Sequence, residues 1–152
     1  TPFTWRILHA PVLGQLFLKR RNLLMERGIY LNVWYRERLT PAVLNAYRFP
    51  FPDYDSRTGI LAFPRTIPLR PGDRGWDTVA RLEAGLKDLD MPARILWGEG
   101  DIVFPPEFAM RFYETLPKAH EPIFFKDGRH FIQEDHPEEI TDAILDLIRE
   151  IS

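Results

Sequence analysis

"ARILWGEGD" at residues 93–101 and "EPIFFKDGRH" at residues 121–130 decide the fold of this chain. Each stretch is a short run of aliphatic and aromatic residues that ends in glycine and charged residues, as a buried strand and its turn do. A proline-started helical stretch lies between them at residues 105–117, and residues 137–152 read as a closing helix with acids in its first turn. This strand–helix–strand–helix order predicts parallel α/β structure with both faces of the sheet covered.

The first part of the chain reads as mostly helical. Apolar residues recur there at three-to-four spacing, and Thr40 and Pro41 suit the N-cap and first position of a helix. Residues 49–75 are dense in proline, glycine and aspartate and predict loops around a short helix near residues 55–63. Residues 76–89 have the pattern of an amphipathic helix.

Two strands make an incomplete sheet. An isolated parallel pair cannot cover its own faces and edges, so this sequence must either hide further strands or continue a larger sheet. Strands in residues 1–90 would have to lack the usual pattern. We therefore favour the second alternative, in which the chain is the C-terminal part of a larger sheet protein.

The composition excludes several classes of function. A length of 152 residues with 45% apolar residues indicates a globular domain with a core. The net charge of −2 gives no electrostatic case for binding nucleic acid or an anionic membrane. No apolar run approaches the roughly 20 residues of a membrane span. No signal peptide is visible, and cysteine is absent, so we expect a cytoplasmic protein without disulfides.

Asp101 and His130 stand at the ends of the two predicted strands. Because the carboxyl ends of neighbouring parallel strands meet at one edge of a sheet, both side chains should lie at the same rim. Imidazole transfers protons near neutral pH, and a buried carboxylate fixes its tautomer and stabilises its charged form. Either residue alone could be an ordinary turn residue, but together they favour a catalytic acid–histidine pair.

The other histidines lack such a partner. His9 lies in a helix-like segment and His120 in a short loop, while His136 precedes the closing helix. The spacing of His130, Glu134 and His136 matches no zinc motif, so we expect neither a metal nor a cofactor.

No nucleophile is evident in the chain. Cysteine is absent, and serine occurs only at Ser56, in a loop, and at Ser152, the last residue. The G-x-S-x-G elbow that presents a nucleophilic serine is missing. We therefore expect the nucleophile to lie upstream of Thr1.

Two stretches resemble a known fold and family. Residues 95–120, "ILWGEGDIVFPPEFAMRFYETLPKAH", and 128–140, "GRHFIQEDHPEEI", resemble the C-terminal end of the α/β-hydrolase fold. Residues 39–69, "LTPAVLNAYRFPFPDYDSRTGILAFPRTIPL", resemble the helical cap of haloalkane dehalogenases. The resemblance implies that residues 1–75 form a cap and residues 76–152 the C-terminal part of the hydrolase core.

The family's chemistry implies roles for two residues. In haloalkane dehalogenases an aspartate displaces halide from carbon, and a histidine activates the water that hydrolyses the resulting ester. The resemblance places the base on His130 and the orienting acid on Asp101. It also implies a small apolar substrate, such as a halogenated alkane, together with water and an N-terminal half that supplies the nucleophile.

Four residues are candidates for contact with substrate. Ile102 and Phe131 directly follow the two catalytic candidates, while Phe3 and Trp5 stand where the cap would leave the sheet. Ordinary packing would account for these side chains equally well. Trp5 and Trp34 are further candidates as N–H donors to halide, although no motif fixes either.

Other functions remain open at this point. An epoxide hydrolase would need two cap tyrosines, which the chain could supply, but the "FPFP" and "FPRTIP" stretches argue against it. A serine hydrolase or a luciferase-like protein would differ at the nucleophile. In a different class, the chain would be a non-catalytic half that binds a complementary N-terminal half and has no turnover alone.

Overall fold

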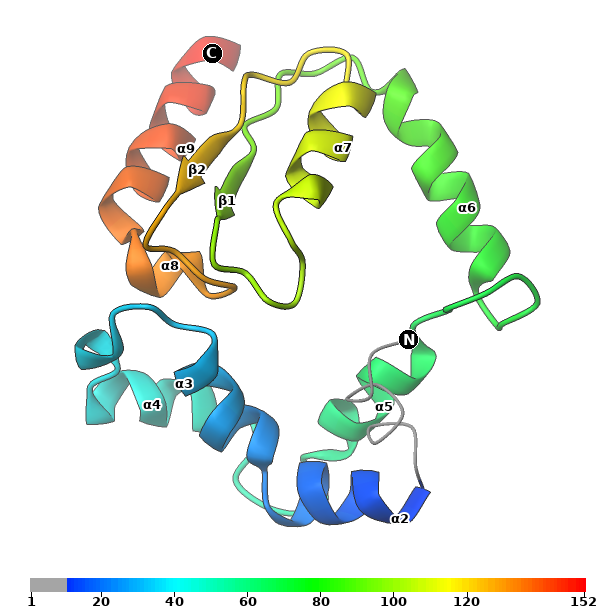
Figure 1. Cartoon of the computed structure of the whole chain (residues 1–152), viewed down its shortest axis with the longest axis vertical. Helices are drawn as coiled ribbons and strands as arrows, with labels where there is room; N and C mark the ends of the chain where they lie inside the picture. The colour runs from blue at the N-terminus through cyan, green and yellow to red at the C-terminus, as the bar shows by residue number, and fades with distance from the viewer. Residues whose placement is uncertain (1–10) are drawn as a thin grey trace. The chain divides into compact units, whose positions relative to one another are not determined.

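The computed structural model describes residues 11–152 and contains short helices, two strands and a long closing helix (Figure 1). Phe3, Trp5 and His9 therefore lie outside the described residues. In chain order the elements are α2 (Pro11–Gly14), π-helical segments at Gln15–Arg20 and Leu24–Gly28, α3 (Ile29–Leu31), a 3₁₀ turn at Arg36–Arg38, α4 (Pro41–Arg48), α5 (Thr58–Thr66), α6 (Trp76–Gly85), a 3₁₀ turn at Leu86–Asp88, β1 (Leu96–Gly98), α7 (Glu107–Thr115), β2 (Ile123–Phe125), α8 (Ile132–Asp135) and α9 (Pro137–Ile151).

The chain divides into two compact units. The described residues of the first unit are 11–30 and 40–81, and the second unit contains Leu31–Leu39 together with Leu82–Ser152. The short segment Leu31–Leu39 thus belongs with residues about a hundred positions later in the chain.

In the first unit, α4 begins as predicted. Thr40 has extended backbone angles, and its Oγ1 accepts a hydrogen bond from Val43 N at 3.3 Å, while Pro41 occupies the first helical position. The helix predicted near residues 55–63 forms three residues later, as α5. The helix begins later because residues 53–56 form a turn. In this turn Asp53 Oδ1 accepts the N–H groups of Asp55 and Ser56, which keeps both residues out of the helix.

A small apolar core holds the first unit together. Leu18, Ile60 and Leu61 are buried, and Met25 and Phe51 pack against them. The π-helical segment that carries Leu18 is thereby joined to α5, and burial of each large aliphatic side chain contributes about 1.5–3 kcal/mol.

In the second unit, the two predicted strands form and pair in parallel, as expected. Leu96 pairs with Ile123, and Gly98 pairs with Phe125. Figure 1 shows the two strands between α7 and α9, the two helices that the sequence predicts after them. The fold is therefore the parallel α/β arrangement that the sequence predicts.

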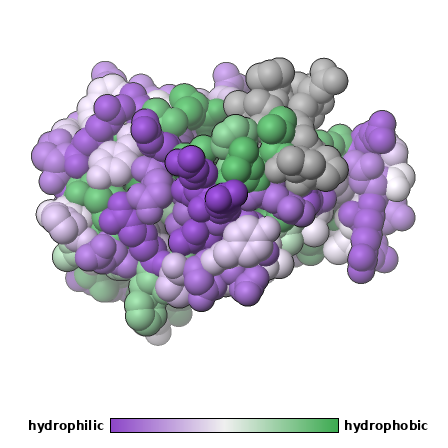
Figure 2. Space-filling view, turned by 90° about the horizontal axis from the view of Figure 1, so that it is seen from below, coloured by the Kyte–Doolittle hydropathy of each residue, from purple (hydrophilic) through white to green (hydrophobic). Residues whose placement is uncertain are grey.

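The sheet is less covered than its apolar strands predict. Only one residue of each strand is buried, and Ile123 is 40% exposed. Helix α9 also exposes Ile144, Ile148 and Ile151. Two strands with one helix on each side offer too few neighbours to bury these side chains, and Figure 2 shows apolar residues open to solvent among polar ones.

Candidate active site at the ends of the two strands

Two glycines bring the ends of the strands together. Gly100 N donates to the carbonyl oxygen of Gly128 at 3.0 Å, just beyond the paired residues. A Cβ atom on Gly98 would lie 2.6 Å from the carbonyl carbon and oxygen of Gly128, which is closer than real Cβ contacts. Glycine at position 98 is therefore required for the two turns to touch.

Asp101 follows this contact and is held rigidly. Its Oδ1 accepts the backbone N–H groups of Val103 at 2.7 Å and Phe104 at 2.9 Å. Its Oδ2 lies 2.9 Å from His130 Nδ1, and the side chain is only 7% exposed. Because an ionised carboxylate only accepts hydrogen bonds, Nδ1 is the donor, and Nε2 is the ring nitrogen that can take up a proton.

Aromatic side chains surround the imidazole of His130. The rings of Phe104 and Phe131 each lie 5.5 Å from it between centroids, and Phe131 meets it edge-on. Trp97 Nε1 donates to the carbonyl oxygen of Phe104 at 2.8 Å and fixes the loop that carries Phe104. The His130 side chain remains 31% exposed, so the imidazole is packed against apolar rings and still reachable from solvent.

A shallow cavity of about 160 Å³ opens beside this pair. Its volume is below the ~300–1,000 Å³ that is usual for ligand pockets. The residues that line this cavity include Trp97, Asp101, Phe104, Arg129, His130 and Ile132.

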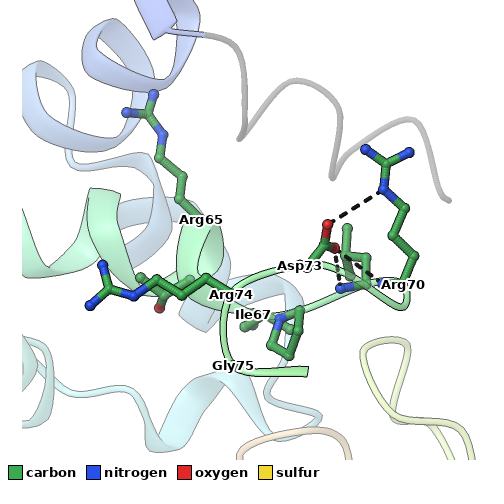
Figure 3. Close-up of a pocket in the computed structure, with 9 residues that line it drawn as sticks. Arg65, Ile67, Arg70, Asp73, Arg74 and Gly75 are labelled. Carbon is green, nitrogen blue, oxygen red and sulfur yellow. Dashed lines mark hydrogen bonds and ion pairs between the residues drawn. The ribbon is translucent and has the colours of Figure 1, made fainter. Parts of the chain in front are cut away.

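A broader hollow of about 1160 Å³ lies in the first unit (Figure 3). Asp73 organises it, since its Oδ2 accepts the N–H groups of Leu69 at 2.9 Å and Arg70 at 3.1 Å. The hydrogen bond from Leu69 N–H, followed by the bonds from Arg70, lowers the pKa of Asp73. In Figure 3, Arg70 turns toward Asp73, whereas Arg65 and Arg74 point elsewhere. This hollow contains a stabilised surface turn and no acid–base pair comparable with Asp101 and His130.

The structure places the sequence-predicted site residues as follows. Asp101 and His130 meet, as their positions at the strand ends predict. Phe131 lies beside His130, whereas Ile102 is 71% exposed and is not among the residues that line the cavity. The substrate-binding roles of Phe3 and Trp5 concern residues outside the described range.

Trp34 belongs to the second unit and contacts the strand-end turns. The guanidinium carbon of Arg129 lies 5.4 Å from the centre of its ring. Its ring also lies 3.5 Å from the point where Gly100 would carry a Cβ atom. Trp34 is thus a neighbour of the turn that precedes Asp101, and its role as a halide donor stays a prediction.

Sequence reasoning missed one residue of this region. Asp135, which is not among the predicted site residues, is only 1% exposed and accepts three backbone N–H groups. Two of these belong to Trp34 and Tyr35, which precede it by about a hundred positions. No local sequence signal could have found partners at that separation.

The other described histidines serve packing and surface pairing. His136 is buried and stacks on Phe125 at 4.3 Å between centroids, with Asp127 and Glu139 each 3.2 Å from one of its nitrogens. A backbone hydrogen bond and, next, the contact with His136 lower the pKa of Glu139. His120 pairs with a carboxylate of α9 at the surface.

Residues 11–152 contain neither a metal-binding cluster of side chains nor a membrane-spanning helix. No three or more histidine and acidic side chains gather there as a metal ion would require. No helix in that part of the chain is both long and apolar enough to cross a membrane.

Comparison with known proteins gives no matching family model but clear relatives. A cis-3-alkyl-4-alkyloxetan-2-one decarboxylase of Xanthomonas campestris is 33% identical over 94% of the chain and 48% of its own length. A haloalkane dehalogenase of Bradyrhizobium diazoefficiens is 30% identical over 92% of the chain and 44% of its own length. The chain thus spans about half the length of these relatives.

Solved structures of haloalkane dehalogenases also resemble this chain. An ancestral haloalkane dehalogenase has a TM-score of 0.87 and 30% identity, covering 99% of this chain and 53% of its own. The haloalkane dehalogenase DbeA of Bradyrhizobium elkani has a TM-score of 0.87 and 29% identity, covering 97% of this chain and 50% of its own. The chain is therefore haloalkane dehalogenase-like, and its fold is that of the C-terminal part of an α/β-hydrolase.

Proposed function

We propose that the protein that contains this chain hydrolyses carbon–halogen bonds with His130 as general base. The observation that carries the proposal is the distance of 2.9 Å between His130 Nδ1 and Asp101 Oδ2 at the ends of neighbouring parallel strands. Relatives named haloalkane dehalogenase support the choice of reaction. The order of acid and histidine along the chain also agrees with a triad on this fold.

The proposed reaction has two steps. In the first, a carboxylate outside this chain attacks the carbon that bears the halogen, so that an ester forms and halide leaves with the bonding electrons. In the second, His130 Nε2 takes a proton from water while the water oxygen bonds to the ester carbonyl carbon. When the tetrahedral intermediate collapses, His130 returns its proton to the departing alcohol oxygen, and the carboxylic acid that remains releases its proton to solvent, which restores the carboxylate.

Asp101 acts through His130. Its carboxylate holds Nδ1–H, so that Nε2 faces the water, and it stabilises the imidazolium that forms when the water is deprotonated. Because Val103 and Phe104 N–H groups hold the other carboxylate oxygen, Asp101 cannot turn away from the ring. The pair is thus oriented before substrate binds.

The remaining parts of the proposal concern the rest of the site. Residues 1–75 would form the cap and residues 76–152 part of the core, while an N-terminal half would complete the sheet and supply the nucleophile. The aromatic walls at Phe104 and Phe131 suit a small apolar substrate, such as a halogenated alkane. The lack of cysteine fits the proposed cytoplasmic location.

A second candidate reaction has one specific observation in its favour. Two relatives, at 33% and 32% identity, are named cis-3-alkyl-4-alkyloxetan-2-one decarboxylase. Such a reaction would convert a four-membered lactone into an alkene and carbon dioxide. That overall conversion consumes no water, so the two candidates differ in whether water enters the products.

The experiment offers the whole protein a 1-bromoalkane and, separately, a cis-3,4-dialkyl-oxetan-2-one. Dehalogenation predicts equal amounts of bromide and alcohol. In a single turnover in ¹⁸O-labelled water, the label should enter the enzyme carboxylate and not the alcohol, because water attacks the carbonyl carbon. Alkene and carbon dioxide from the lactone, without bromide from the bromoalkane, would replace the first candidate by the second.

A further inference from the structure

We propose that Asp135 positions His130 for its hydrogen bond with Asp101, as the centre of a clamp formed with residues 31–35. The role of the clamp in catalysis rests on the function proposed above. Its geometric part, that Asp135 keeps the His130–Asp101 bond in place, does not depend on the substrate.

The carboxylate of Asp135 is buried and fully engaged. Its Oδ1 accepts the N–H groups of Trp34 at 2.8 Å and Tyr35 at 3.0 Å, and its Oδ2 accepts Arg129 N–H at 3.0 Å. Only 1% of the residue is exposed. A buried carboxylate is costly unless hydrogen bonds compensate for the lost water, and here three backbone donors do so.

Arg129 immediately precedes the base, so this bond acts next to the site. A backbone N–H cannot move without moving the chain on either side of it. The bond from Arg129 N to Asp135 therefore restrains the backbone of His130 directly.

Residues 31–35 hold the loop from both sides of the base. Phe131 N, on the far side of His130, donates to the carbonyl oxygen of Asn32 at 3.0 Å. The Arg129 guanidinium donates to the carbonyl oxygen of Leu31 at 2.7 Å and lies over the Trp34 ring. The two neighbours of His130 in the chain, Arg129 and Phe131, are thus both hydrogen-bonded to residues 31–35.

The backbone carbonyl of Asp135 also accepts a hydrogen bond from a side chain. Arg38 Nη1 donates to the Asp135 carbonyl oxygen at 2.9 Å. Arg38 lies three residues after the segment 31–35, so the chain that follows this segment also holds the main chain of Asp135.

The clamp matters for function because the base works only in a narrow geometry. A general base must lie within about 2.6–3.2 Å of its partner atoms, and a displacement near 1 Å can cost about 10²-fold in rate. A purely structural Asp135 would affect folding, whereas a positioning Asp135 affects the step that needs His130. That difference makes the proposal testable.

The test uses the variant Asp135→Asn in the whole protein. Asparagine keeps the shape of the side chain but replaces one acceptor oxygen with an N–H₂ donor. That donor must face either Arg129 N–H or the N–H groups of Trp34 and Tyr35, and the contact on that side is lost. The matched control is Asp142→Asn, the same change at an exposed position of α9.

The first readout needs no substrate. In mildly alkaline solution, ¹H–¹⁵N spectra of the imidazole should show the Nδ1–H tautomer of His130 in the unchanged protein and in the control. In Asp135→Asn we expect a mixture of tautomers or an exchange-broadened signal. A signal identical to that of the unchanged protein would overturn the proposal.

The second readout separates the two chemical steps. With a 1-bromoalkane, Asp135→Asn should keep the initial burst of bromide but hydrolyse the ester about 10- to 100-fold more slowly. If the bromide burst and the rate of ester hydrolysis fall by the same factor, Asp135 has only a structural role. If the unchanged protein releases no bromide, the proposed function fails, and the imidazole spectra still decide the role of Asp135.

A second variant covers the case in which Asp135→Asn does not fold. Arg129→Ala leaves the N–H that Asp135 holds but removes the guanidinium bond to Leu31 and the contact with Trp34. We expect a smaller change in the same direction in both readouts. An unchanged tautomer and an unchanged hydrolysis rate in this variant would contradict the clamp.

Discussion

Gly98 and Gly128 touch through their backbones, and this contact sets the approach of Asp101 to His130. A Cβ atom at position 98 would meet backbone atoms of Gly128 at 2.6 Å and the Arg129 carbonyl oxygen at 2.7 Å. Backbone atoms within two paired turns cannot move aside as a side chain can. The absence of a side chain at position 98 is thus a condition for the acid–histidine pair.

Gly98→Ala should therefore separate the strand ends. We expect a loss of about 1–3 kcal/mol in the free energy of unfolding, since the added methyl group overpacks a contact between backbones. Thermal unfolding of the whole protein measures this. Gly59→Ala is the matched control, because a Cβ there meets nothing within 4 Å and alanine favours the helix. Equal effects of the two changes would count against the contact.

His130→Gln should stop the proposed reaction after its first step. Glutamine cannot accept a proton from water, so hydrolysis of the ester should slow by about 10²–10⁴-fold, while bromide is still released once per site. Mass spectrometry of the protein after exposure to a bromoalkane should show one added alkyl group. Absence of the adduct, with bromide release intact, would exclude the ester mechanism.

Asp101→Asn should weaken the base without abolishing the first step. Asparagine can still accept a backbone N–H, but it no longer stabilises the imidazolium and permits the wrong tautomer. We expect turnover to fall by about 10³-fold or more, with the bromide burst preserved. Turnover equal to that of the unchanged protein would show that another acid orients His130.

Glu26 and Arg48 predict an acid-sensitive contribution to stability in the first unit. The two side chains share a bidentate contact at 2.6 and 2.8 Å, and this hydrogen bond is the main reason that the pKa of Glu26 is lowered from 4.5. A carboxyl group with a lowered folded-state pKa stabilises the fold above its unfolded pKa, and this contribution is lost as pH falls through the folded value.

Glu26→Gln should therefore lower the melting temperature at neutral pH, and the gap from the unchanged protein should close below pH 4.5. Both side chains are partly exposed, so the effect should be small and should shrink in high salt. Melting curves over a pH series measure it. A gap that persists unchanged in acid would mean that packing and not charge is responsible.

The order of elements in the second unit could be read from the sequence because each signal is local. Leu96–Gly98 and Ile123–Phe125 form strands where apolar runs end in glycine. Their parallel pairing, and hence the meeting of Asp101 and His130, follows from the helix between them. These features depend on neighbours within about 30 positions.

What could not be predicted depends on distant partners or on fine helical geometry. The π-helical form of Gln15–Arg20 shares its apolar spacing with an α-helix, so the pattern cannot separate them. The short helix Ile132–Asp135 lies in a stretch that reads as polar turn. The clamp around Asp135 requires residues that sequence alone places in the cap.

The bond between Asp135 and the N–H groups of Trp34 and Tyr35 spans about a hundred positions, with a consequence for biosynthesis. At about 5–20 residues per second, the ribosome needs roughly 5–20 seconds to make the chain between them. During that interval the two donors must be satisfied by water. The bonds of residues 34 and 35 to Asp135 can form only after residue 135 has been made, so the backbone next to His130 reaches its final position late in folding.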